Sequence, residues 1–181
     1  MRLRGNAMLK SFYPDAFCES AYAIDYAALY RSGVRGLIFD IDNTLVPHGA
    51  PADQRAKELF RKLREMGFHT CLLSNNRRPR VESFAIGVGA ENYVWKSGKP
   101  KPSACRKAMA AMGTSPGSTV FIGDQLFTDI CCANWARVRS ILVPQIDKKE
   151  EIQIVLKRRL EKIVLYFWRR AERRENGAEN S

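Results

Sequence analysis

Short apolar runs that alternate with segments of helical periodicity constrain the fold of this chain more than any other feature. These runs are typical of buried strands and lie at residues 34–40, 69–74, 92–95, 119–124 and 140–144. In the first intervening segment, apolar residues recur every three or four positions, at Ala56, Leu59, Phe60, Leu63 and Met66. Strands joined by helices predict an α/β fold, in which a parallel sheet of roughly five strands is the middle of a Rossmann-like three-layer α/β/α arrangement.

The length of the chain and of its connections predicts one core without an added domain. The 181 residues suffice for one well-buried core. We expect an N-terminal segment and helix at 1–33, the core at 34–147, a basic amphipathic helix at 148–174 and a polar tail at 175–181. Only one helix fits between the first two predicted strands, and only a short helix between the second and the third. We therefore expect an uncapped core.

The charge of the chain indicates which kinds of partner it can bind. The 30 Lys+Arg and 19 Asp+Glu residues give a formal net charge of +11, which favours a phosphorylated substrate, a nucleic acid or an acidic membrane surface. No apolar run approaches the about 18 residues of a spanning helix, and the basic start lacks the apolar stretch of a secretory signal. Five cysteines without CxxC spacing predict no disulfide partner. We expect a cytoplasmic protein in a reducing compartment.

Polar side chains follow four of the predicted strands. Asp40, Ser74 and Asp124 end the first, second and fourth strands, and Lys99 follows the third. The carboxyl ends of parallel strands lie at one edge of a sheet, where α/β proteins bind ligands. With Asp42 two residues after Asp40, we expect two or three carboxylates, a hydroxyl group and an ammonium group to converge on one crevice.

This set of groups predicts phosphoryl transfer. Asp40 and Asp124 can share a divalent cation, and Mg²⁺ prefers such oxygen ligands. The cation and Lys99 would neutralise a phosphoryl group, so that Asp40 could attack it and form an aspartyl-phosphate. Asp42 is close enough to donate a proton to the leaving oxygen and then to activate water. Ser74 and backbone N–H groups could hold the non-bridging phosphoryl oxygens.

The motifs that carry this prediction resemble those of a known superfamily. They are D-x-D-N-T-L at 40–45, S-N at 74–75, K-P at 99–100 and G-D-x-x-x-x-D at 123–129. In this order they resemble the four motifs of the haloacid dehalogenase (HAD) phosphatases, subfamily IIIA. The resemblance implies a Mg²⁺-dependent phosphomonoester hydrolase that works through an aspartyl-phosphate.

The resemblance also implies roles for individual residues. The implied catalytic residues are Asp40, Asp42, Ser74 and Lys99. The implied metal ligands are Asp40, Asp42 through its backbone carbonyl, Asp124 and Asp129, the last of which supports the metal or the lysine. Candidate substrate contacts flank the motifs and comprise Asn43, Thr44, Asn75, Arg77 and Arg78. The sequence leaves Lys101 open as an alternative to Lys99, and a solvated loop as an alternative to a headgroup clamp at the arginines.

Three further segments narrow the resemblance. "MLKSFYPDAF", "YAID" and "GDQLFTDI" resemble the subfamily of YqeG-like bacterial proteins and mitochondrial phosphatidylglycerophosphate phosphatases. This likeness implies conversion of phosphatidylglycerophosphate to phosphatidylglycerol, with the protein peripheral on the inner membrane face, and it raises Met8 as an alternative start. The alternatives are a phosphatase of nucleic acid ends, phosphoproteins or soluble phosphoesters, and a non-catalytic adaptor of the same fold.

Apolar residues outside the core pattern allow two more predictions. A stripe at helical spacing marks the C-terminal helix, at Ile152, Leu156, Leu160, Ile163 and Phe167. With basic residues on another face, this helix would either lie on an anionic membrane or pack on the sheet. Trp95 and Trp135 fall in strand and helix patterns and are predicted to be core residues.

Overall fold

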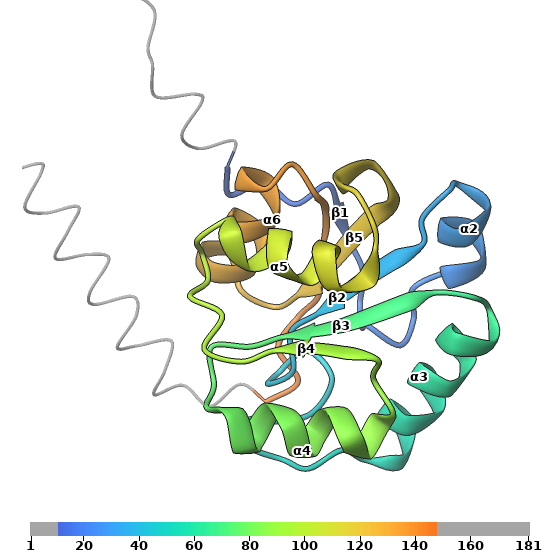
Figure 1. The fold of residues 1–181 in the computed structure, drawn as a ribbon, viewed down its shortest axis with the longest axis vertical. Coiled ribbons are helices and arrows are strands. Elements are labelled where there is room, and N and C mark those ends of the chain that lie inside the picture. The colour runs from blue at the N-terminus through green and yellow to red at the C-terminus, as the bar shows by residue number, and fades with distance from the viewer. Residues whose placement is uncertain (1–10, 148–181) are drawn as a thin grey trace, which may run out of the picture. The chain divides into compact units, whose positions relative to one another are not determined.

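A six-stranded parallel sheet forms the centre of the computed structural model, which describes residues 11–147 (Figure 1). The strands follow the order β1-β6-β5-β2-β3-β4. Their bounds are β1 Ala16–Phe17, β2 Gly36–Phe39, β3 His69–Leu73, β4 Asn92–Val94, β5 Thr119–Gly123 and β6 Arg139–Leu142. The predicted C-terminal helix at 148–174, the tail at 175–181 and the start at Met8 lie outside the described residues and stay predictions.

Helices cover both faces of the sheet, as the strand and helix alternation predicts. They are α2 Tyr26–Arg31, α3 Gln54–Glu65, α4 Arg78–Val88, α5 Ser103–Met112 and α6 Cys131–Trp135. Figure 1 shows α3 and α4 on one side of the sheet and α5 and α6 on the other. Successive side chains of a strand point to opposite faces. Leu37 and Phe39 accordingly join the core that contains Phe60 of α3, whereas Ile38 joins the core beneath α5 and α6. The three-layer α/β/α prediction is confirmed.

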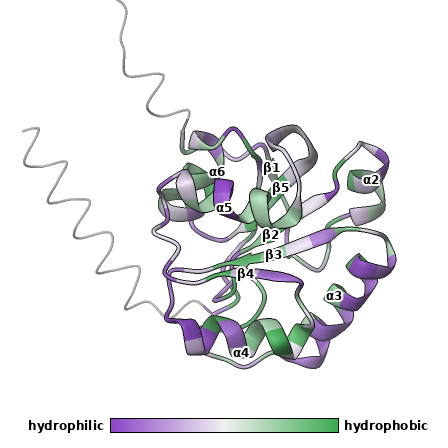
Figure 2. Ribbon diagram, viewed as in Figure 1, coloured by the Kyte–Doolittle hydropathy of each residue, from purple (hydrophilic) through white to green (hydrophobic). Residues whose placement is uncertain are grey.

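Helix α3 shows how local sequence sets an element in place. Asp53 is its N-cap, and the side-chain Oδ1 accepts a hydrogen bond from the Ala56 N–H at 2.7 Å. Gly67, with φ of 86°, then lets the chain turn back toward β3. Figure 2 shows mainly hydrophilic residues on this helix, because only one stripe is buried, at Ala56, Leu59, Phe60 and Leu63.

The structure differs from the sequence-based prediction at the sixth strand. Strand β1 has two residues, Ala16 and Phe17, which pair with Ile141 and Leu142 of β6. Both β1 side chains are exposed, so no buried apolar run in the sequence indicates this strand. The predicted N-terminal segment therefore contributes an edge strand in addition to helix α2.

The two tryptophans are the clearest errors of the sequence-based prediction. Trp95 is 40% exposed and Trp135 is 47% exposed, so neither is a core residue. Trp95 comes one residue after the end of edge strand β4, and Trp135 is the last residue of the short helix α6. At such ends the strand or helix period no longer sets the direction of a side chain.

The connections between strands carry no cap within residues 11–147. Only α3 lies between β2 and β3, and only α4 lies between β3 and β4. In the same part of the chain, no helix is long and apolar enough to cross a membrane.

Gly123, the last residue of β5, permits a close approach of the chain. A Cβ atom at this position would lie 2.6 Å from Cβ and from Oδ2 of Asp129. Real Cβ atoms do not approach other atoms so closely, so any side chain here would push the Asp129 segment away from the sheet.

We predict that Gly123→Ala lowers the free energy of unfolding by about 1–3 kcal/mol, the usual effect of forcing extra atoms into a packed interior. Urea denaturation measures this change. Gly117→Ala is the matched control, since its Cβ would meet nothing within 4 Å. Equal effects of the two substitutions would contradict the prediction.

Candidate active site

Three buried carboxylates meet at the carboxyl edge of the sheet. Asp40 directly follows β2, Asp124 directly follows β5, and Asp129 lies in a π-helical turn at Leu126–Ile130. Strands β2 and β5 are neighbours in register, with Phe39 opposite Ile122, so Asp40 and Asp124 emerge side by side. One oxygen from each of the three carboxylates lies within 4.8 Å of the others. Like charges at this spacing repel each other, so the group requires compensation.

Lys99 supplies part of that compensation. Its Nζ lies 2.6 Å from Oδ1 of Asp40 and 2.7 Å from Oδ1 of Asp129. The Lys99 side chain is only 4% exposed, whereas Lys101 is exposed. Between the two lysines that the sequence left open, the structure brings Lys99 to the carboxylates.

Asn75 fixes the backbone that carries Lys99. Its Oδ1 accepts hydrogen bonds from the Lys99 N–H at 2.9 Å and from the Ser97 hydroxyl at 2.8 Å. Its Nδ2 donates to the Lys99 carbonyl oxygen at 3.2 Å. Asn75 stays a predicted substrate contact, and in the structure its amide group is bonded on both sides to the lysine loop. These hydrogen bonds position Lys99.

The electrostatics of the cluster show that one ammonium group is not enough. Burial raises the pKa of Asp40 to about 8, because the effect of Lys99 does not offset burial together with the charges of Asp129 and Asp124. Burial and Asp129 raise the pKa of Asp124 to about 6, although hydrogen bonds from Gln145 and Thr44 oppose the shift. Burial lowers the pKa of Lys99, but Asp129 and Asp40 outweigh it and raise the pKa above its usual value.

The donor set of this cluster fits a hard divalent cation. Carboxylate oxygens are the ligands that such cations prefer, and three of them lie within 4.8 Å of one another here. Asp129 is the most deeply buried of the three. Its Oδ2 accepts a hydrogen bond from the Gln125 N–H at 3.1 Å, which holds the carboxylate in place.

Asn43 and Thr44 line the turn after Asp42, and their side chains bond to protein groups. Thr44 Oγ1 donates to Asp124 Oδ1 at 3.1 Å. Asn43 has a left-handed backbone, with φ of 65°, and its Oδ1 accepts a hydrogen bond from the Asp147 N–H at 3.3 Å. Both residues were predicted as substrate contacts, and in that role they stay predictions. In the structure they hold Asp124 and the chain after β6.

Asp42 lies apart from the three-carboxylate cluster and faces the start of α4. Its Oδ1 accepts hydrogen bonds from the Gly49 N–H at 2.7 Å and from Arg80 Nη2 at 2.9 Å, and its Oδ2 accepts one from Asn76 Nδ2. Two residues of this set, Asn76 and Arg80, were not among the predicted site residues. Helical phase could have found Arg80, because a residue in the first turn of α4 can point back toward the strand ends.

The remaining predicted site residues are Ser74, Arg77 and Arg78. Ser74 follows β3, is 2% exposed, and its Oγ accepts a hydrogen bond from the Asn76 N–H at 3.2 Å. Arg77 is exposed, and Arg78 pairs with Glu82 at 3.0 Å on the surface of α4. The structure brings Ser74 to the same edge as Asp40, and it leaves Arg78 outside the cluster.

Comparison with known proteins shows the family of this chain. Residues 48–136 match a family model described as haloacid dehalogenase-like hydrolase. The probable phosphatase YqeG of Bacillus subtilis is 33% identical over 160 residues, which cover 87% of this chain and 92% of that protein. The phosphatidylglycerophosphate phosphatase 1 of Arabidopsis thaliana, chloroplastic/mitochondrial, is 27% identical over 164 residues. That match covers 81% of this chain but only 45% of the Arabidopsis protein.

A solved structure shares the fold. The cobalt-bound form of the deoxy-D-mannose-octulosonate 8-phosphate phosphatase from Haemophilus influenzae has a TM-score of 0.51 and 16% identity, over 62% of this chain and 69% of that one. At this identity the likeness concerns the fold alone. The coverage and identity of the Bacillus relative go further. This chain belongs to the haloacid dehalogenase-like hydrolases and is a phosphatase of the YqeG-like family.

Proposed function

We propose that this phosphatase hydrolyses phosphomonoesters through an aspartyl-phosphate on Asp40, with Mg²⁺ as its cofactor. The main support for this proposal is the buried group in which Lys99 contacts Asp40 and Asp129 and Asp124 lies beside them. A nucleophilic carboxylate needs positive charge around the phosphoryl group that it attacks. Lys99 supplies one such charge, and the three neighbouring carboxylates offer oxygen ligands for a cation that would supply a second.

The proposed Mg²⁺ ligands are the carboxylates of Asp40, Asp124 and Asp129 and the backbone carbonyl of Asp42. When bound, the cation would neutralise charge on the phosphoryl group and on the carboxylates around it. Ser74, at the end of the neighbouring strand β3, is proposed to bond a phosphoryl oxygen.

The proposed reaction has two displacements at phosphorus. Asp40 attacks, the bond from phosphorus to the alcohol oxygen breaks, and Asp42 gives its proton to that leaving oxygen. Asp42 then accepts a proton from a water molecule, whose oxygen attacks the aspartyl-phosphate, releases inorganic phosphate and restores Asp40. Gly49, Asn76 and Arg80 hold the Asp42 carboxylate for both proton transfers.

We propose phosphatidylglycerophosphate as the substrate, cleaved at a membrane surface to phosphatidylglycerol. Three observations support this choice. The sequence resembles the subfamily that contains such phosphatases, and a relative at 27% identity carries that name. The site has no cap within residues 11–147, which suits a headgroup that stays in its bilayer. The net charge of +11 favours an anionic surface.

We predict that Mg²⁺ stabilises the fold more as the pH rises. In the metal-free protein, a carboxyl group whose pKa is raised in the folded state stabilises the fold at pH values below its ordinary pKa of 3.8. That contribution is lost as the pH passes about 6 for Asp124 and about 8 for Asp40. Bound Mg²⁺ would offset the loss by about 2.7 kcal/mol at a hundredfold excess over its dissociation constant.

Thermal unfolding with Mg²⁺ or with a chelator, at about pH 5.5 and about pH 8.5, measures this effect. The gain in Tm should be larger at the higher pH. Asp124→Asn should remove most of the gain. A gain that is equal at both pH values, or larger at the lower one, would count against a cation at these carboxylates.

We predict that the protein releases phosphate from phosphatidylglycerophosphate in mixed micelles with Mg²⁺ present. Asp40→Asn should lower the rate by at least about a thousandfold, as expected for loss of a covalent nucleophile, while circular dichroism shows an intact fold. The same assay with phosphorylated oligonucleotides, phosphopeptides and soluble phosphoesters tests the alternatives. Turnover of one of these and not of the lipid would refute the substrate and leave the chemistry standing. No turnover of any phosphoester would refute both.

A further inference from the structure

Apolar side chains stand exposed around the site, at the carboxyl edge of the sheet. Four of them lie on loops that leave this edge: Trp95, Leu126, Phe127 and Ile146, which are 40%, 37%, 41% and 46% exposed. Trp95 follows β4, the Leu126–Phe127 pair follows β5, and Ile146 follows β6. Apolar side chains that gather in this way at one edge mark an interaction surface more often than scattered ones do.

The stretches of these loops nearest the exposed apolar residues are basic, although half-buried Asp147 directly follows Ile146. They span residues 47–49, 75–78, 95–101, 125–128 and 144–146, and none of these positions is Asp or Glu. Their exposed cations are Arg77, Arg78, Lys96 and Lys101. Glu19, after edge strand β1, and Asp53, which caps α3, lie beyond the five loops. We call the exposed residues of these five loops the rim.

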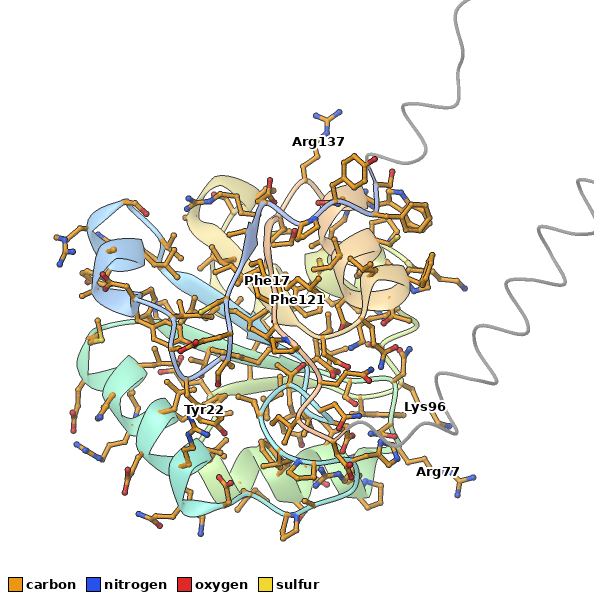
Figure 3. The ribbon with its side chains drawn as sticks, turned by 180° about the vertical axis from the view of Figure 1, so that it is seen from behind. Phe17, Tyr22, Arg77, Lys96, Phe121 and Arg137 are labelled. Atoms are coloured by element: carbon orange, nitrogen blue, oxygen red, sulfur yellow. The ribbon has the colours of Figure 1, made fainter. Side chains whose placement is uncertain are left out.

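Backbone hydrogen bonds tie loops of the rim to neighbouring loops in two places. The Lys96 N–H donates to the Asn76 carbonyl oxygen at 2.9 Å, which ties the β4 loop to the β3 loop. The Ile146 N–H donates to the Asn43 carbonyl oxygen at 3.1 Å, which ties the β6 loop to the turn after Asp42. In Figure 3, Lys96 and Arg77 lie on the same side of the molecule, and Arg137 lies at a different end.

Two aromatic contacts hold apolar parts of the rim in place. Phe127 packs edge-on against Phe12, with 5.1 Å between ring centroids. Lys96 Nζ lies 5.9 Å from the centre of the Trp95 ring, which places a cation beside an aromatic ring. Such a pair suits a boundary between polar headgroups and apolar chains.

We propose that the rim docks on the surface of an anionic phospholipid bilayer and turns the site toward the headgroups. Leu126, Phe127 and Ile146 would enter the boundary between headgroups and acyl chains, and Lys96 and Lys101 would pair with lipid phosphates. This inference rests on the proposed function only for the choice of a phospholipid surface as the occupant.

The composition of the rim favours a bilayer over a nucleic acid. A surface for single-stranded nucleic acid combines cations with aromatic side chains on which bases stack. The rim also exposes two aliphatic side chains, Leu126 and Ile146, on separate loops. Single apolar side chains on several loops suit the boundary of a bilayer, because each of them can enter the headgroup layer separately.

The test uses the full chain and vesicles of phosphatidylcholine with or without phosphatidylglycerol. Leu126→Ser with Ile146→Ser removes two apolar tips, and Phe17→Ser with Ile86→Ser is the matched control, since these side chains are 67% and 75% exposed and lie outside the rim. We expect the rim pair to lower sedimentation with anionic vesicles by at least about fivefold, and the control pair to have no effect.

A second pair of variants tests the cations. Lys96→Asn with Lys101→Gln removes two rim charges, and Arg31→Gln with Arg139→Gln removes two exposed charges elsewhere. Each lysine is expected to contribute about fivefold to binding at an anionic surface, so the rim pair should bind about twentyfold more weakly. All variants keep residues 148–181, so any affinity of that segment is common to them. Turnover of a soluble phosphoester should stay within about twofold of the wild-type rate, because docking is not needed for it.

The outcomes separate docking from the proposed function. If the rim variants bind anionic vesicles like the wild type, or if the controls lose as much, the docking proposal is wrong even if the lipid is hydrolysed in micelles. If the rim variants lose binding while the lipid is not hydrolysed, the docking proposal is supported and the proposed substrate is wrong. Wild-type protein that ignores both vesicle types, or that binds an oligonucleotide with dependence on the lysines alone, would overturn the bilayer as the partner.

Discussion

The double contact of one buried ammonium group with two carboxylates is the interaction on which the rest of the site depends. Lys99 joins Asp40, at the end of β2, to Asp129, in the turn after β5. A buried carboxylate that loses its partner becomes very costly, so the surrounding chain is arranged to keep the three together. Asn75 holds the lysine backbone with both ends of its amide group, and Gly123 leaves the space that Asp129 occupies. The strand order places β2 between β5 and β3, so that Asp40 stands in the middle of the edge.

The buried carboxylates and the single ammonium group link the fold to the chemistry. One lysine faces three carboxylates, and burial keeps the pKa of Asp40 raised despite the contact with Lys99. Asp42, two residues after Asp40, lies apart from this cluster and accepts hydrogen bonds from Gly49 and Arg80. Phosphoryl transfer needs these same features, because charge must be balanced around an anionic group while a carboxylate attacks it.

Much of this could be predicted from the sequence, since strand ends in a parallel sheet are fixed by hydrophobic pattern alone. Asp40, Ser74, Lys99 and Asp124 were placed at one edge for that reason, and the structure brings them there. What escaped prediction depends on contacts between distant segments. Strand β1 carries exposed side chains and is defined only by its pairing with β6. The choice of Arg80 over its neighbours depends on the phase of α4, and the amide of Asn75 faces the lysine loop because a residue 24 positions away meets it.

The central claim is that Asp40 receives the phosphoryl group, and trapping this intermediate tests it most directly. The enzyme would be mixed with Mg²⁺ and a phosphoester labelled in its phosphoryl group, quenched in acid within one turnover, digested and mapped by mass spectrometry. The account predicts label on the peptide that contains Asp40, at the carboxylate that touches Lys99, and none in Asp40→Asn. Label on another residue, or turnover that never labels the protein under conditions in which an acyl phosphate survives, would contradict it.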